Sequence, residues 1–122
     1  MQRFRGGVMM EKNSIKSYQE YSEDKFTKRV IYKKGETTAF LLNFLPGQQL
    51  PPHKHPGTEV YLYFVTGNGT IIIDGQDTKV TEADIIHVTS EEEMAFKNTG
   101  TEPVSIYVVL SKIPSEQYAK NI

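Results

Sequence analysis

The sequence predicts an all-β protein, a sandwich or barrel of about eight or nine short strands. Three observations favour this fold class. Segments rich in Val, Ile, Tyr, Phe and Thr recur along the chain, Gly, Pro, Asn and Asp separate them, and no stretch between them is long enough for a crossover helix. The chain has 122 residues, of which 38% are hydrophobic, so it has room for one core and one domain.

The first five predicted strands differ in character, but a turn follows each of them. Segment 28–33 is basic at its ends, and segment 38–45 is mostly apolar. Segment 59–66 is aromatic, and 70–74 contains three consecutive isoleucines, which are strong strand formers. The short segment 77–80 ends near Glu82, Ala83 and Asp84, which form the next turn.

Three further segments complete the predicted β structure. Segment 84–88 leads into an acidic turn, and 94–98 leads into a turn that ends in proline. The last strand, 104–110, is apolar on both faces, and such a strand is covered on both. We therefore expect a homodimer through the outer sheet, since two-fold dimers are the commonest oligomers. Beyond it, Ser115 can cap a short C-terminal helix over 116–121.

The first 27 residues contain no predicted strand. Residues 1–8 lack the apolar stretch of a signal peptide, and two methionines, Met9 and Met10, follow them. We expect translation to start at one of these methionines and the preceding residues to be mobile. Segment 12–26 is polar and weakly patterned. The predicted organisation is thus a leader and unassigned segment over 1–27 and a β-barrel over 28–122.

Composition excludes several classes of function. The formal net charge is −1, from 14 Lys and Arg against 15 Asp and Glu, which gives no basic footprint for nucleic acid or an anionic membrane. No apolar run approaches the length of a membrane span. The absence of cysteine excludes disulfides, thiolate metal sites and cysteine nucleophiles. We expect a cytoplasmic protein whose partner is a small-molecule ligand or substrate.

The candidate catalytic and metal-binding residues lie between positions 47 and 59. His53 and His55 are two residues apart, so in an extended chain their side chains project side by side. A Pro-Gly turn follows, and Glu59 opens the next strand. Two imidazoles and one carboxylate that meet at one point suit a divalent transition metal such as Fe, Mn, Ni, Cu or Zn.

This stretch resembles the first motif of the cupin family. In that motif a glycine is followed after five residues by His-x-His, after three or four more by Glu, and after six more by a second glycine. Gly47, both histidines and Glu59 match, but seven residues separate Glu59 from Gly67. The extra residue predicts a bulge or longer turn before Gly67. Counting back over six intervening residues from Gly67 places the ligand position at Val60. We nevertheless assign the ligand to Glu59, because it carries a carboxylate and the match from Gly47 up to it is unbroken.

The second cupin motif falls on residues 83–98, where only the spacing and Asn98 are kept. Met94 stands where the family has its third histidine. A thioether is a poor ligand for Fe, Mn or Zn, although Cu(I) accepts it, and methionine is also a common cavity filler. The resemblance spans about residues 28–110. It implies a double-stranded β-helix, or jelly-roll barrel, that is often dimeric and holds a metal or ligand in the barrel mouth.

Other side chains are candidates for a ligand pocket around this site. Tyr61 and Tyr63 share a strand face with Glu59, and Phe96 shares one with Met94. If Glu59 points into the barrel, these residues make a mostly apolar pocket with a few polar groups, which is typical of small-molecule sites. His87 lies alone in a predicted strand, and a histidine in such a position is more often hydrogen-bonded or exposed than a metal ligand. The predicted pocket consists of Tyr61, Tyr63, Met94, Phe96 and His87.

Two classes of function remain open at this point. An enzyme would use a metal on His53, His55 and Glu59 for oxygenase, decarboxylase or isomerase chemistry, or a metal-free His and Tyr pair for epimerisation. A binding module would hold a small molecule without transforming it, as the missing third histidine favours. A purely structural dimer is a third possibility, which the retained His-x-His disfavours.

Overall fold

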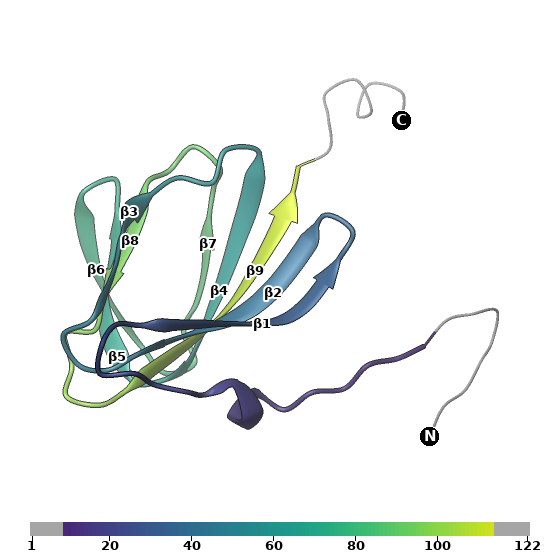
Figure 1. Cartoon of the computed structure of the whole chain (residues 1–122). Helices are drawn as coiled ribbons and strands as arrows, with labels where there is room; N and C mark the ends of the chain where they lie inside the picture. The colour runs from purple at the N-terminus through teal and green to yellow at the C-terminus, as the bar shows by residue number, and fades with distance from the viewer. Residues whose placement is uncertain (1–8, 114–122) are drawn as a thin grey trace.

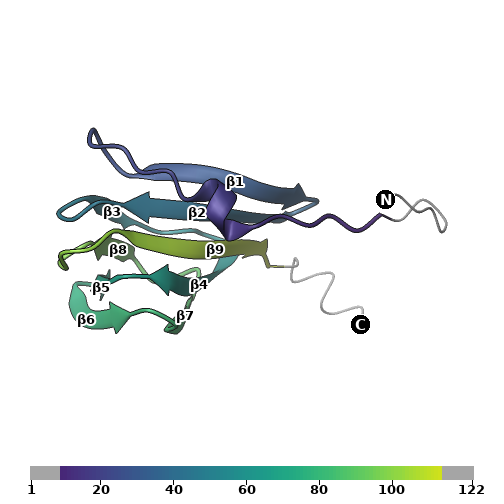
Figure 2. The same cartoon turned by 90° about the horizontal axis from the view of Figure 1, so that it is seen from below.

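The protein is described by a computed structural model over residues 9–113. Two antiparallel sheets pack face to face (Figures 1 and 2). One sheet has the strand order β1-β2-β9-β4-β7, and the other has the order β3-β8-β5-β6. The elements are η1 (Ile15–Tyr18), β1 (Thr27–Lys34), β2 (Thr37–Phe44), β3 (Gln49–His53), β4 (Thr58–Thr66), β5 (Asn68–Ile73), β6 (Gln76–Thr81), β7 (Ile85–Val88), β8 (Met94–Lys97) and β9 (Val104–Lys112).

The predicted all-β fold is confirmed, and each of the eight expected strands corresponds to an observed one. The remaining strand, β3, carries the first histidine of the His-x-His pair. The expected helix over 116–121 and the expected leader over 1–8 lie outside the described residues. Within residues 9–113, no helix has the length and apolar character needed to cross a membrane.

The core lies between the two sheets and follows the alternation of the strands. In β4, Val60, Leu62 and Phe64 are buried and face the second sheet. Phe96 of β8 meets them from that sheet, with its ring centroid 5.7 Å from that of Phe64 and 4.9 Å from that of Phe44. Burying such side chains stabilises the fold by about 1.5–3 kcal/mol each. This burial fixes which face of β4 points inward.

The predicted irregularity before Gly67 is confirmed. The pairing of β4 with β9 shifts register between Phe64 and Thr66. Gly67 then turns the chain with a φ of +80°, and a Cβ there would lie 2.5 Å from the carbonyl oxygen of Pro103. Only glycine fits both this backbone conformation and this close approach.

Residues 13–21 pack along the outer face of the five-stranded sheet (Figure 2). Asn43 of β2 and Ser105 of β9 are fully buried on this outer face. The Asn43 amide donates to the Tyr18 carbonyl at 2.9 Å, and the Ser105 hydroxyl lies 2.6 Å from the Tyr21 hydroxyl. Part of the outer face of β9 is therefore covered by the chain itself, which gives a second reason why 104–110 is apolar on both sides.

Asn98, which the second cupin motif retains, has a structural role. Its side chain is buried, and its amide donates to the carbonyls of Phe44 at 3.1 Å and Glu102 at 2.9 Å. Its carbonyl oxygen accepts from the Gly100 amide at 3.0 Å. Asn98 therefore holds the loop between β8 and β9 against the end of β2.

Candidate functional site

The two histidines lie side by side at the end of β3, as the sequence predicts. Their ring centroids are 4.6 Å apart, with an angle of 76° between the ring planes. Both are half-buried, whereas Lys54 between them is exposed. His53 pairs in register with Met94, the first residue of β8. The histidines and the methionine thus come together at one end of the barrel.

These three residues line a cavity of about 150 Å³ between the two sheets. Most of its other walls are apolar side chains from β2, β3 and β9, and β1 contributes a lysine. The complete lining is Phe26, Lys28, Phe40, Leu42, Leu50, His53, His55, Met94, Val108 and Leu110. A dry apolar cavity of this size accommodates a molecule such as benzene.

The polar groups of the cavity are all basic. The Nδ1 of His53 lies 2.8 Å from the Pro51 carbonyl. Because a carbonyl can only accept, Nδ1 donates, and Nε2 of the neutral ring carries a lone pair. Burial lowers the pKa of His55 below 6.5, and the neighbouring His53 and Lys28 lower it further. The Lys28 ammonium lies 4.5 Å from the centroid of the Phe40 ring.

Glu59 does not join the two histidines, which corrects the expected ligand set. In β4 the buried Val60 and Leu62 face the core, so the alternating Glu59 faces the outer side of the sheet. Its carboxylate pairs there with Nε2 of His87. The reason is the phase of β4, because an inward Glu59 would turn three large apolar side chains to solvent. Val60 points inward, and it is the residue that the family spacing of six residues before Gly67 places at the ligand position.

The predicted pocket residues are divided between the two faces of the sheets. Met94 lines the cavity, and Phe96 is buried beside it in the core. Tyr61 and Tyr63 follow the phase of Glu59 and are 46% and 40% exposed on the outer face. His87 stacks on Tyr61 there, with a centroid distance of 5.0 Å. The tyrosines and His87 therefore contribute nothing to the cavity.

The donor set of the cavity fits only some metals. Within residues 9–113, no group of three or more His, Cys, Asp or Glu side chains can hold an ion. Two imidazoles and the Met94 thioether do not match Fe, Mn or Zn, which prefer nitrogen and oxygen donors or thiolates. A soft ion such as Cu(I) accepts two imidazoles and a thioether.

Sequence reasoning missed Lys28 and the apolar walls of the cavity. The direction of Lys28 depends on the register of β1, where it pairs with Leu42, and nothing in the basic segment 28–33 reveals that register. The apolar residues carried a clearer signal. Val108 and Leu110 alternate with outward residues along β9, so their shared face was readable from the sequence.

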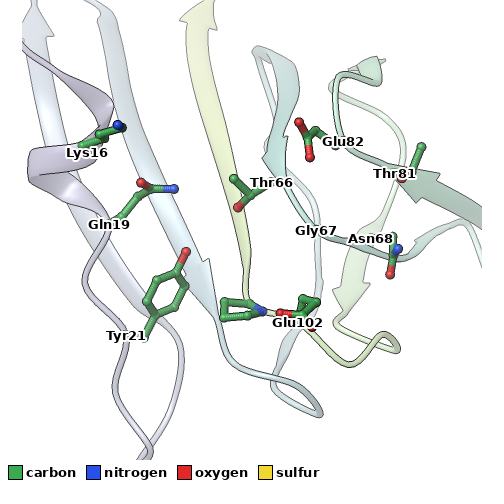
Figure 3. A pocket seen from close by; sticks show the side chains of 10 residues that line it. Lys16, Gln19, Tyr21, Thr66, Gly67, Asn68, Thr81, Glu82 and Glu102 are labelled. Carbon is green, nitrogen blue, oxygen red and sulfur yellow. The ribbon is translucent and has the colours of Figure 1, made fainter.

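A larger and more open concavity of about 770 Å³ lies at the other end of the barrel, where β4 turns into β5 (Figure 3). Most of its lining residues are of polar type, and they come from residues 16–21, the turn at Gly67, the end of β6 and the loop before Pro103. None of the predicted site residues lines it. Of the predicted site residues, His53, His55 and Met94 line the smaller cavity.

Comparisons with known proteins agree with this architecture. The family described as Cupin domain matches residues 40–110. The chain is 25% identical over 81 residues to the tetracenomycin polyketide synthase protein TcmJ of Streptomyces glaucescens. This match covers 65% of the chain and about half, 54%, of that relative.

Solved structures show the same fold at low sequence identity. The protein TT1209 from Thermus thermophilus superposes with a TM-score of 0.80 at 20% identity, over 86% of this chain and 100% of that one. A predicted oxalate decarboxylase from Thermotoga maritima superposes with a TM-score of 0.60 at 20% identity, over 78% of this chain and 100% of that one.

Proposed function

Because the chain belongs to the cupin family, we propose that it binds a small organic molecule in the mouth of its barrel. The observation that carries this proposal is the cavity of about 150 Å³, with apolar walls and half-buried histidines at its edge. Such a combination of apolar lining and few polar groups is typical of small-molecule sites. The apolar walls would exclude water from the ligand, and the basic groups would orient it.

The positions of the tyrosines favour binding over catalysis. A metal-free epimerase needs a base and an acid that both reach the substrate. Histidines line the cavity, but Tyr61 and Tyr63 lie on the outer face of the sheet. Glu59, the expected carboxylate, is also on that face. The binding module is therefore the function that we propose first.

Uncharged probes of the right size test the cavity itself. We expect benzyl alcohol and 4-methylpentan-1-ol to shift backbone amide NMR signals of residues around the cavity. Leu110→Phe should fill the cavity and abolish these shifts, because Leu110 lines it. Val109→Phe is the matched control, since Val109 directly precedes Leu110 in β9 and its side chain points to the other face of the sheet. Equal shifts in both variants, or no shifts in the wild type, contradict the proposal.

A second candidate function is the binding of a soft metal ion. The observation in its favour is the register of His53 with Met94, beside the ring of His55. Elemental analysis of protein loaded with copper under reducing conditions tests it, with His53→Ala/His55→Ala and Met94→Leu as variants. Stoichiometric copper that both variants lose supports the candidate. Substoichiometric metal that the double variant leaves unchanged removes it.

We also propose that the protein forms a homodimer through the uncovered part of the outer sheet. Tyr61, Tyr63 and Ile85 are exposed on β4 and β7, and together they form the outer patch. Ile85 is the most exposed of them, at 77%. A two-fold interface places the same patch of both copies in contact, which would remove these apolar side chains from water.

A further inference from the structure

The charges around the cavity are unbalanced. Lys28, His53 and His55 line it, and no carboxylate does. Among the basic residues of the described chain, Arg29, Lys34 and Lys112 each form an ion pair with a glutamate. Lys28 forms no such pair with any residue of 9–113. Its ammonium is instead held over an aromatic ring at the cavity.

From this arrangement we propose that the cavity binds a small organic monocarboxylate. The carboxylate would lie against Lys28 and His55, and the apolar body would lie between Phe40, Leu42 and Val108. The inference rests on the proposed function, because it names the class of ligand for the same cavity. It goes beyond that function by assigning the recognition of charge to Lys28.

Two physical points support an anion at this position. The contact with Phe40 confines the Lys28 ammonium near the cavity, so less side-chain entropy is lost when a ligand binds. A charge-assisted hydrogen bond from lysine to a carboxylate is about twice as strong as a neutral one.

The size of the cavity limits the rest of the ligand. About 150 Å³ accommodates a single six-membered ring or a short branched chain, comparable to benzene. Apart from the two histidines and Lys28, its walls offer hydrocarbon and one thioether. A ligand with several hydroxyl groups would lose hydrogen bonds to water there without regaining them. The ligand class is therefore a carboxylate with one small apolar body.

Benzoate and its uncharged isostere benzamide separate the recognition of charge from the recognition of shape. Dissociation constants come from amide NMR titrations of the wild type, Lys28→Met and Lys33→Met. We expect the wild type to bind benzoate at least about fivefold more tightly than benzamide, since hydrogen bonds to charged groups contribute most. Lys28→Met should remove this preference, so that the two dissociation constants become about equal. Lys33→Met is the matched control on the same strand, because Lys33 does not line the cavity.

The outcomes of these titrations distinguish this inference from the proposed function. Equal affinities for the acid and the amide, unchanged in Lys28→Met, overturn the carboxylate inference and leave the cavity as a binding site. Binding of benzyl alcohol without binding of benzoate has the same consequence. If none of the three probes binds, both proposals fail. A loss of the preference for benzoate in Lys33→Met as well would show bulk electrostatics and also overturn the inference.

Discussion

At His55, burial and two neighbouring basic groups act on protonation in the same direction. The largest cause of its lowered pKa is burial, followed by the charges of His53 and Lys28. All three disfavour the imidazolium form in the folded protein. The unfolded chain has no such environment, so its imidazole keeps a pKa near 6.5. Folding and proton binding at this residue therefore oppose each other.

This opposition predicts how stability depends on pH. Below about pH 6.5 the unfolded state binds a proton at His55 that the folded state does not, so the free energy of unfolding falls as the pH falls through this window. Above it, both states are neutral and the effect disappears. Urea denaturation at pH 7.5 and 5.5 should show a smaller loss on acidification for His55→Gln than for the wild type. An equal loss in both proteins contradicts the prediction.

Glu59 and His87 form an exposed pair on the outer face, with side chains 31% and 47% exposed. Such pairs contribute little, about 0–1 kcal/mol, because water and salt screen them. We predict that Glu59→Gln lowers the free energy of unfolding by less than about 1 kcal/mol and leaves the affinity for benzyl alcohol unchanged. NMR titration checks the affinity, and His53→Ala serves as the contrasting variant at the cavity. A loss of benzyl alcohol binding in Glu59→Gln would contradict this prediction and show that Glu59 belongs to the binding site.

At the scale of elements, residues 13–21 cover part of the outer face of β2 and β9. Asn43 is the centre of this contact. Its amide donates to the Tyr18 carbonyl and to the Thr27 hydroxyl, and its carbonyl oxygen accepts from the Ser105 hydroxyl at 2.7 Å. Each of these groups is satisfied inside the protein, so the segment that carries Tyr18 and Tyr21 is tied to the sheet by buried polar contacts.

We predict that Asn43→Ala is strongly destabilising, by about 2 kcal/mol or more, because it removes the three hydrogen bonds of a fully buried side chain. Asn13→Ala is the matched control, since Asn13 accepts only an exposed hydrogen bond from the Tyr18 hydroxyl. Chemical denaturation measures both. A change of less than about 0.5 kcal/mol in Asn43→Ala would mean that this network is not important for stability.

At the scale of the whole molecule, the two faces of the five-stranded sheet have different roles. The inner face builds the core and the cavity. The outer face is covered over β2 and part of β9, whereas β4 and the edge strand β7 carry the exposed outer patch. A dimer through this patch would leave the cavity open, because the cavity lies between the two sheets.

The dimer predicts a mass of two chains in light scattering at micromolar concentration. Ile85→Lys should shift the protein toward the monomer, because it places a charge within an apolar contact. Val30→Lys is the control, since Val30 is also exposed and apolar but lies on β1, away from the patch. A monomeric wild type, or equal dissociation in both variants, excludes the patch as the interface.

The fold class, the number and order of most strands and the side-by-side placement of His53 and His55 can all be predicted from the sequence alone. These features depend on local information. Strand propensity, turn residues and the two-residue period are each readable within a few positions of the chain. The irregularity before Gly67 was readable in the same way, from one extra residue in a spacing.

Long-range contacts determine which groups share the cavity. Alternation along β4 gives two faces but does not say which one is buried, and Glu59 lies on the outer one. That choice depends on the combined burial of Val60, Leu62 and Phe64 against the opposite sheet. Lys28 lines the cavity because of the register in which β1 pairs with β2, and this pairing joins residues distant in sequence. Contacts between residues distant in sequence therefore place the Lys28 ammonium, and not the Glu59 carboxylate, beside the two histidines. For this reason the ligand that we propose is an organic anion rather than a metal ion.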